Sequence, residues 1–336
     1  MYNRHIRVYS PLRVSFIGGG TDITPFPEEY GGAVLNTTID IGVLVRYAPD
    51  AYPLEIVSRD LVSSYLVGTK GRSNLEKLSK MLSENGLRCG KILINGDVPP
   101  GSGLGSSSAL VTALTLLGSS TNGKKLGPGA LALKAYNTER NDLGVLLGFQ
   151  DPYAIAIGGF KFMELRGPDK YSVERFRKSK GFIEYISSHM LLLYTGGTRE
   201  STAALKEQVS RSLKGDSNTI EKLSRLKQLA FKARDCARAS DIDGFAEAIN
   251  RGWSIKRGLG SSVSNNRIDS LVNFGMRNGA MAGRLLGGGS DGFIMFIAKE
   301  KSMGHLQKSL SRSNRFIVRA SINEKGTHAL GAGTDL

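Results

Sequence analysis

Cysteine, histidine and long apolar runs are scarce in this sequence of 336 residues. Two cysteines, Cys89 and Cys236, are too few for a disulfide framework or for a cysteine-ligated metal site. The four histidines include no pair at i, i+4 spacing, which argues against a histidine zinc site. No apolar run reaches the roughly 18 residues of a membrane helix, and the first residues lack the apolar core of a signal peptide. These absences predict a cytoplasmic protein without a membrane partner.

Aromatic residues are also few, at 7%, although the formal net charge is +15. Such a charge invites a nucleic-acid interpretation. The basic residues are scattered, however, without a run of five, and so few aromatics give no obvious base-stacking platform. We expect a solvated basic surface that suits phosphorylated small molecules, and no nucleic-acid partner. A salt-titrated binding assay would identify the alternative, because nucleic-acid binding weakens steeply with salt.

The length predicts about two domains, which we divide into residues 1–182 and 183–336. The first half alternates short strands with helices, whereas amphipathic helices dominate after residue 202. We expect the remaining tail after Glu324 to be frayed. The expected strands are 4–9, 13–17, 33–47, 55–67, 91–95, 189–194, 293–298 and 315–322. The expected helices are 73–86, one beginning near 106, 128–143, 202–213, 219–239, 243–256, 266–278 and 302–311.

Glycine is abundant, with 42 of 336 residues (12.5%) against an average of about 7%. Three clusters carry much of the excess, at 18–20, 101–105 and 287–289. The middle cluster lies between an expected strand and an expected helix, where glycines let backbone N–H groups converge on an anion at the helix N-terminus. A tight turn with a serine cap would need only one glycine and one serine. We therefore predict a phosphate site at Pro100, Gly101, Ser102, Gly103, Leu104, Gly105, Ser106, Ser107 and Ser108.

This segment matches neither common nucleotide motif. Ser106 stands where a dinucleotide fold would have glycine. The nearest Walker-type string, 118–124, is followed by Lys125 where serine or threonine is required. A different kind of phosphate loop is implied.

The segment PPGSGLGSSSA resembles the second signature of the GHMP kinases, the family of galactokinase, homoserine kinase and mevalonate kinase. PLRV at 11–14 with GGGTD at 18–22 is similar to the first signature, and RLLGGGSDGF at 284–293 is similar to the third. The order of the three motifs is also that of the family. GGGTD, VLNTTI at 34–39 and YTGGTR at 194–199 most resemble the D-glycero-D-manno-heptose 7-phosphate kinase branch.

The resemblance implies an α+β fold of two domains, a ribosomal-S5-domain-2-like N-terminal domain and a ferredoxin-like C-terminal domain with extra helices. It implies ATP and Mg²⁺ as cofactors and an active site between the two domains. A homodimer is the assembly that it would allow. It makes Asp151 the catalytic base, Arg13 its partner, and Ser107 and Glu139 the metal ligands. The residues implied to bind the sugar are Gly19, Gly20, Thr21, Asp22, Gly288 and Gly289.

The residues alone leave plainer interpretations open. Glu139 could be an exposed helix carboxylate, Asp151 part of an ordinary Asp-Pro turn, and Asp22 a turn residue. Arg13 is more telling, because a charge inside an apolar strand is costly unless it is paired. Arg13 therefore needs a carboxylate partner, whether its role is structural or catalytic.

A phosphate on the acceptor would need its own cation. Arg199, after the turn at 195–198, is the first candidate, and Lys256 and Arg257 are weaker ones. For Lys256 and Arg257 we favour a simple pair of cations at a helix C-terminus. Ser290 and Asp291 depart from the glycines of the third signature, and a carboxylate there would repel phosphate unless a metal intervenes or it faces the acceptor.

The expected activity is ATP-dependent phosphorylation of a sugar hydroxyl, with the anomeric C1 hydroxyl of D-glycero-D-manno-heptose 7-phosphate as the first candidate. The alternatives are another GHMP specificity, such as a fucose-type sugar or an isoprenoid alcohol, and a kinase-like binding protein without catalysis. The joint presence of Arg13, Ser107, Glu139 and Asp151 argues against lost catalysis.

Overall fold

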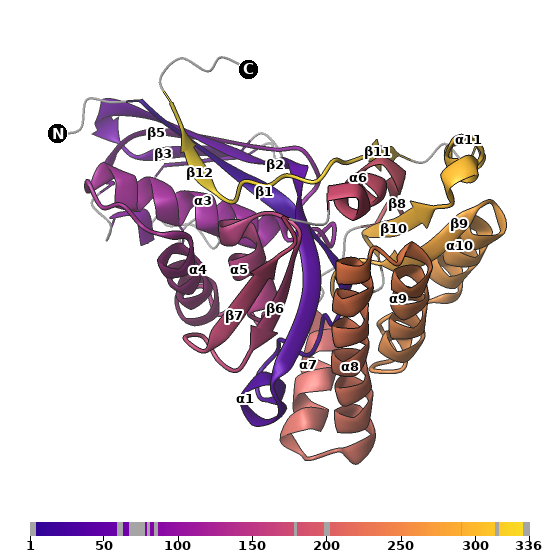
Figure 1. Ribbon diagram of the computed structural model, residues 1–336. Helices are drawn as coiled ribbons and strands as arrows, with labels where there is room; N and C mark the ends of the chain where they lie inside the picture. The colour runs from indigo at the N-terminus through magenta and orange to yellow at the C-terminus, as the bar shows by residue number, and fades with distance from the viewer. Residues whose placement is uncertain are drawn as a thin grey trace.

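The computed structural model describes residues 5–58, 63–66, 78, 81–83, 87–177, 180–197, 202–289, 291–312 and 316–331. Most of the helix expected at 73–86 lies outside these ranges, and so do Arg199 and Ser290. The described strands form two sheets, which lie on the left and on the right of Figure 1. None of the described helices has both the length and the apolar character of a membrane span.

The first sheet contains β1 (Ile6–Ile17), β2 (Gly32–Pro53), β3 (Glu55–Ser58), β4 (Ser63–Leu66), β5 (Cys89–Gly96), β6 (Lys161–Leu165), β7 (Tyr171–Arg175) and β12 (His328–Leu330). Its order is β12-β1-β2-β5-β3-β4, and β6 joins β2 to β7. The strands expected at 4–9 and 13–17 form one continuous strand, because a register shift between Pro11 and Arg13 absorbs the irregularity. β2 likewise runs as one strand and is long enough to pair with β1, β5 and β6.

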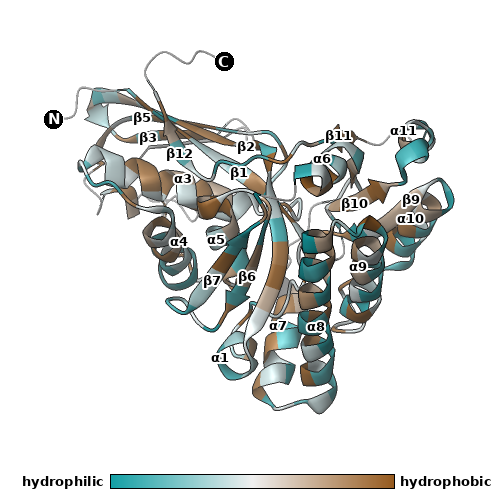
Figure 2. Ribbon diagram, in the orientation of Figure 1, coloured by the Kyte–Doolittle hydropathy of each residue, from teal (hydrophilic) through white to brown (hydrophobic). Residues whose placement is uncertain are grey.

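The helices of the first half are α1 (Phe26–Tyr30), α3 (Ser106–Thr121), α4 (Pro128–Asn137), the π-helix η1 (Thr138–Asp142) and α5 (Gln150–Ile157). α3 packs against β1 and β2, and α5 packs against α3 and α4. In Figure 2, α3 is coloured mostly from white to brown, in agreement with the burial of most residues after Ser107. The single helix expected at 128–143 is thus α4 continued by a π-turn.

The second sheet contains β8 (Met190–Tyr194), β9 (Ala280–Leu285), β10 (Phe293–Ala298) and β11 (Ile317–Arg319), in the antiparallel order β11-β8-β10-β9. Its helices are α6 (Lys180–His189), α7 (Thr202–Leu213), α8 (Ser217–Ala239), α9 (Ile242–Arg257), α10 (Asn266–Arg277), the 3-10 helix η2 (Glu300–Ser302) and α11 (Met303–Ser311). α9 and α10 pack against β9, and α8 also reaches β1 and β2 of the first sheet.

Side-chain caps fix the start of three of these helices. Asp216, Asp241 and Asn265 accept hydrogen bonds from the backbone N–H groups three residues further on, at 2.7, 2.9 and 3.0 Å. Such caps satisfy N–H groups that the helix itself leaves unpaired. The expected helices of this half are accordingly confirmed to within about two residues at each end.

The C-terminal tail contradicts its expected fraying. β12 pairs antiparallel with β1, with Tyr9 opposite His328 and Arg7 opposite Leu330. The backbone N–H of Thr327 also donates to Ile155 O at 3.0 Å, which ties the tail to the end of α5. β12 therefore belongs to the sheet of the first half. The division of the chain at residue 182 stays a prediction, and β12 lies on the other side of that boundary from the rest of its sheet.

One hydrophobic core joins the two halves. Phe160 contacts Phe16 and Phe182, with ring centroids 5.3 and 5.7 Å apart, and both of those rings also approach Phe245 of α9. All four side chains are at most 1% exposed. The shared core holds β1 and α9 in a fixed relationship, and residues of both elements line the site described next.

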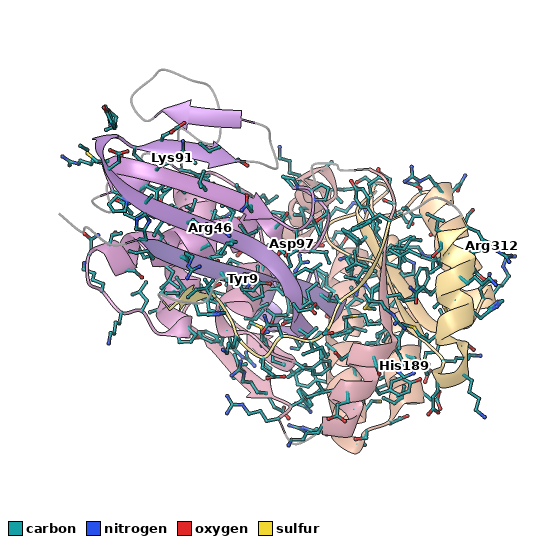
Figure 3. The ribbon with its side chains drawn as sticks, turned by 90° about the horizontal axis from the view of Figure 1, so that it is seen from above. Tyr9, Arg46, Lys91, Asp97, His189 and Arg312 are labelled. Carbon is teal, nitrogen blue, oxygen red and sulfur yellow. The ribbon has the colours of Figure 1, made fainter. Side chains whose placement is uncertain are left out.

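Basic side chains are distributed over distant parts of the molecule. Figure 3 places Arg46 and Lys91 on the first sheet and Arg312 at α11. Several exposed cations have acidic partners, including Lys91 with Glu55 at 2.9 Å and Arg238 with Glu174 at 2.7 Å. Some of the positive charges are thus paired locally, and the basic residues form no single cluster among those labelled.

Candidate active site

A cavity of about 190 Å³ lies where the three glycine clusters meet. Its lining combines the loop before α3, the turn after β1, the start of α5, the end of α9 and the turn between β9 and β10. Both halves of the chain therefore contribute to one site. The sequence places small residues here because backbone segments approach one another closely.

The loop before α3 has the geometry of an anion site. Gly101, Gly103 and Gly105 have positive φ angles of 75°, 85° and 77°, which side-chain-bearing residues rarely adopt. Gly105 stands at the helix N-cap, and no side chain caps the first turn of α3. The free N–H groups and the positive end of the helix dipole thus face the cavity, as phosphate binding requires.

Six of the nine predicted ATP residues line the cavity: Gly101, Gly103, Gly105, Ser106, Ser107 and Ser108. Leu104 does not, and its fully buried side chain belongs to the hydrophobic core. Pro100 and Ser102 also lie outside the lining, and the backbone carbonyl of Ser102 accepts from Phe293 N at 2.9 Å. These three residues shape the loop, and their predicted contact with nucleotide stays a prediction.

The second and third glycine clusters are packed backbone against backbone. A Cβ atom added to Gly103 would lie 2.6 Å from Leu286 O, and one added to Gly287 would lie 2.6 Å from Gly103 Cα. Contacts this short exclude any side chain. The glycines therefore let a turn of the second sheet close directly over the phosphate loop.

Arg13 and Asp151 form a two-bond ion pair in the cavity wall. Nε and Nη2 of Arg13 donate to Oδ1 and Oδ2 of Asp151 at 2.7 and 2.6 Å, and Nη1 donates to Gly103 O at 2.5 Å. Arg13 is 5% exposed, whereas the Asp151 side chain is 26% exposed. The carboxylate partner that the buried arginine needed is therefore Asp151, and this carboxylate remains open to the cavity.

Glu139 lies in η1 beneath the first turn of α3. Its carboxylate accepts hydrogen bonds from Ser107 Oγ at 3.0 Å and from Ser108 Oγ at 2.5 Å, and the residue is 1% exposed. Burial raises the pKa of Glu139 to about 7, against the opposing effect of the two serine hydroxyls. The plain interpretation of Glu139 as an exposed helix carboxylate is therefore wrong.

The donor set at Glu139 fits a hard cation. Glu139 has no cationic partner within the part of the chain that the structure describes. Its buried carboxylate and the exposed Ser107 hydroxyl offer oxygen ligands next to the phosphate loop. The described residues contain no group of three His, Cys, Asp or Glu side chains that would hold a metal by themselves. This pattern suits Mg²⁺, which keeps waters and substrate phosphates among its ligands.

Asp22 holds two backbone segments of the site together through its carboxylate. Its Oδ1 accepts from Gly20 N at 2.9 Å and its Oδ2 from Gln150 N at 3.1 Å, the first residue of α5. Burial raises the pKa of Asp22. Asp22 thus anchors the start of the helix that carries Asp151, while it also lines the cavity with Gly19 and Gly20.

Thr21 differs from its neighbours in the turn. It is 0% exposed, and its hydroxyl donates to Gly18 O at 2.8 Å and to Ala33 O at 3.0 Å. Thr21 lies outside the cavity lining and holds the turn against β2, and its predicted contact with the sugar stays a prediction.

The third cluster brings Gly288, Gly289 and Asp291 to the cavity. Asp291 faces Arg267 of α10 at 3.3 Å, and Thr195 Oγ1 approaches the same oxygen at 3.4 Å. A carboxylate at this position was expected to repel phosphate. Arg267 offsets its charge, so the departure from the glycine-rich signature is compatible with an anionic ligand nearby.

Lys256 was underestimated from the sequence. Its neighbour Arg257 pairs with Asp269 at 3.1 Å, as an ordinary cation at a helix end does. Lys256 instead lines the cavity and donates to Gly287 O at 2.9 Å. Residue spacing alone does not tell which of two adjacent cations turns inward. Gln208, whose Nε2 donates to Gly20 O at 2.8 Å, also lines the cavity and was missed entirely.

Comparison with known proteins gives this geometry a family. The model of the family described as "GHMP kinases N terminal domain" matches residues 72–159, which include the phosphate loop, Glu139 and Asp151. The D-glycero-alpha-D-manno-heptose 7-phosphate kinase of Campylobacter jejuni is 28% identical, and the match covers 96% of this chain and 97% of that protein. The chain therefore carries a GHMP kinase N-terminal domain and is similar over nearly its whole length to a sugar kinase.

Solved structures of GHMP kinases share the whole fold. A D-glycero-D-manno-heptose 1-phosphate kinase from Bacteroides thetaiotaomicron has a TM-score of 0.78 and 26% identity, and the match covers 98% of this chain and all of the other. A putative sugar kinase from C. jejuni has a TM-score of 0.76 and 25% identity over 98% and 99% of the two chains. The predicted α+β GHMP fold of two domains is confirmed.

Proposed function

We propose that this GHMP kinase transfers the γ-phosphoryl group of ATP to the anomeric hydroxyl of D-glycero-D-manno-heptose 7-phosphate, giving the 1,7-bisphosphate. The observation that carries the proposal is the Arg13–Asp151 pair, which opens into a cavity that the phosphate loop also lines. The full-length similarity to a heptose 7-phosphate kinase supports the acceptor.

The nucleotide is held by its phosphates. In this mechanism the N–H groups of the loop and of the first turn of α3 bind the β- and γ-phosphates. Ser107 and Glu139 would hold Mg²⁺, which when bound would supply charge neutralisation on those phosphates. Arg13 gives a fixed positive charge near the transferred group, because its guanidinium is locked by Asp151 and Gly103 O.

Asp151 positions the acceptor. The sugar hydroxyl donates its hydrogen bond to the exposed carboxylate oxygen, the hydroxyl oxygen attacks the γ-phosphorus, and the bond to ADP breaks. The proton passes to Asp151 as the new bond forms. The loose transition state asks for little basicity from Asp151, because the hydroxyl loses its proton late in the transfer. Asp22, Gly19 and Gly20 are the proposed contacts of the sugar, and Gly288 and Gly289 close the cavity over it.

A phosphate on the acceptor would be bound by a further cation. Arg199 lies outside the described residues and stays the first candidate on sequence grounds. If it binds that phosphate, Arg199→Ala should raise the KM of the phosphorylated sugar roughly 10- to 100-fold, for a lost charge-assisted contact of about 1.5–3 kcal/mol. Equal losses with phosphorylated and unphosphorylated sugars would refute this assignment.

An acceptor panel tests the proposed function. The names of the relatives differ in the position of the phosphate, so the panel must contain the heptose 7-phosphate, the heptose 1-phosphate and the free heptose. L-Fucose, D-galactose, homoserine and mevalonate represent the other GHMP specificities. We expect the highest kcat/KM with the 7-phosphate. A preference for the free sugar or for the 1-phosphate would overturn the acceptor, and no acceptor-dependent turnover at all would favour a binding protein.

A further inference from the structure

Lys256 stands at the C-terminal end of α9, with its ammonium group inside the cavity rather than in solvent. The packing of α9 against β1 fixes this position: a Cβ added to Gly252 would lie 2.5 Å from Ile17 Cδ1. A Cβ added to Gly19 would lie 3.7 Å from Lys256 Nζ. Gly252 therefore makes room for the close approach of α9 to β1, and the ammonium group of Lys256 lies beside Gly19.

The charge of Lys256 is poorly compensated. Arg13 and Lys256 are the basic residues in the described lining of the cavity. Arg13 has Asp151 as its partner, whereas Lys256 forms no ion pair with any carboxylate that the structure describes. Among the residues that the structure describes, the ammonium group of Lys256 donates one hydrogen bond, to Gly287 O. This leaves two of its three N–H donors for another ligand.

The surroundings of Lys256 disfavour its charged form. Burial lowers the pKa of Lys256 to about 7, and the positive charges of Arg284 in β9 and Arg13 in β1 act in the same direction. Asp22 of the turn after β1 and Asp151 of α5 oppose the shift. Arg284 is itself 1% exposed and donates to Phe16 O at 2.8 Å. The lining carries four carboxylates beside Arg13 and Lys256, but none of those that the structure describes forms an ion pair with the lysine.

The bond to Gly287 places the ammonium next to the phosphate loop. Gly287 touches the backbone of Gly103, and Gly103 O accepts from Arg13. Lys256 and Arg13 therefore reach the junction of the two glycine segments from different elements, α9 and β1. A ligand there with several negative oxygens, such as a phosphoryl group, would accept from the unused donors of Lys256 and pair with its ammonium group.

We propose that Lys256 is a further catalytic residue, whose ammonium group contacts the phosphoryl group during its transfer and stabilises the charge on its oxygens. This inference rests on the proposed kinase function, whose acceptor it leaves unchanged. Lys256 forms no covalent bond. Where it is neutral before ATP binds, it takes one proton from solvent on binding and keeps it through the transfer.

Proton uptake on nucleotide binding is a readout that a purely structural lysine would not give. We would titrate Mg-ATP into the protein at pH 8, without acceptor, by calorimetry in buffers of different ionisation enthalpy. Wild type should take up a substantial fraction of a proton per ATP, since a group with a pKa of about 7 is mostly neutral there. Lys256→Met should remove that uptake. Equal uptake by the two proteins would overturn the proposal.

Steady-state kinetics of the Lys256 variants give a second, independent test. Lys256→Met should lower kcat at least 100-fold with the KM of ATP and of acceptor within a few-fold, and Lys256→Arg should recover part of the loss. Lys222→Met is the matched control, because Lys222 Nζ also donates to a backbone carbonyl at the end of α9, that of Gly258 at 2.7 Å, but is exposed. A kcat within threefold of wild type, or a rise confined to the KM of a phosphorylated acceptor, would refute the catalytic role.

The outcomes separate this inference from the proposed function. The Lys256→Met protein should melt no lower than wild type, because the substitution removes a buried amine that has no ion-pair partner among the described residues. If this protein does not fold, Lys256→Gln replaces it in the calorimetric and the kinetic experiments. ATP binding without proton uptake refutes the role of Lys256 alone. Turnover that depends on Lys256 but with a different acceptor refutes the sugar assignment alone, and a wild type that does not bind ATP refutes both.

Discussion

Arg13 and Asp151 lie 138 residues apart in the sequence and meet through two hydrogen bonds of 2.7 and 2.6 Å. The same guanidinium bonds to Gly103 O of the phosphate loop. One side chain thus connects the proposed proton acceptor with the proposed ATP site. A displacement of the phosphate loop or of α5 would therefore break hydrogen bonds of Arg13.

The pair predicts that arginine and lysine are not interchangeable at position 13. Arg13→Lys keeps the charge but loses the planar fork that binds both carboxylate oxygens. A loss on the order of 1.5–3 kcal/mol corresponds to a kcat about 10- to 100-fold lower. Arg238→Lys is the control, since Arg238 binds Glu174 through two bonds of 2.7 Å on the surface. Equal kcat for Arg13→Lys and wild type would contradict the account.

Asp151→Asn tests the proton acceptor. The amide keeps the size of the side chain but does not accept the proton, and it binds Arg13 less well. We expect kcat to fall roughly 10²- to 10⁴-fold while ATP still binds. Asp235→Asn, at an exposed carboxylate of α8, should behave as wild type. If Asp151→Asn keeps more than a third of the wild-type kcat, Asp151 is not the base.

Glu139→Gln tests the metal site. The amide can still accept from one serine, so the fold should survive, but a hard cation loses an anionic ligand. The Mg²⁺ concentration for half-maximal rate should rise at least tenfold. Glu221→Gln, on the exposed side of α8, gives the reference value. An unchanged Mg²⁺ requirement would return Glu139 to a purely structural role.

Gly103→Ala tests the contact between the two glycine segments. The new Cβ would meet Leu286 O at 2.6 Å at a φ of +85°, so the loop must move away from its position beside Arg13. Gly215→Ala has a similar φ of +68° with no atom within 4 Å of the new Cβ, so it carries only the backbone strain, about 1–2 kcal/mol. Both variants should melt lower than wild type, but only Gly103→Ala should raise the KM of ATP. An unaltered KM would show that the loop does not hold the nucleotide phosphates.

The sequence predicted those parts of the site that are encoded by short segments. The phosphate loop is recognisable because its glycines and serines are consecutive, and helices α7 to α10 because their apolar periodicity and caps are local. The need for a carboxylate near Arg13 also followed from the sequence, since burial of an unpaired charge is costly wherever the partner lies.

Features that depend on contacts between distant segments could not be predicted in this way. β12 has three residues and no pattern of its own; it forms because the edge of β1 offers unpaired backbone groups. β9 was missed because Gly283 and the buried Arg284 interrupt its apolar pattern. The inward turn of Lys256 follows from how α9 packs on β1, which no local pattern records.

The central claim is that this chain catalyses phosphoryl transfer from ATP to the anomeric hydroxyl of a heptose phosphate. Phosphorus NMR of a reaction with Mg-ATP and D-glycero-D-manno-heptose 7-phosphate tests it most directly. We predict ADP together with a new phosphate signal coupled to the anomeric proton, and neither of them with the Asp151→Asn protein. Release of inorganic phosphate without that signal, or a new phosphate on another carbon, would contradict the account.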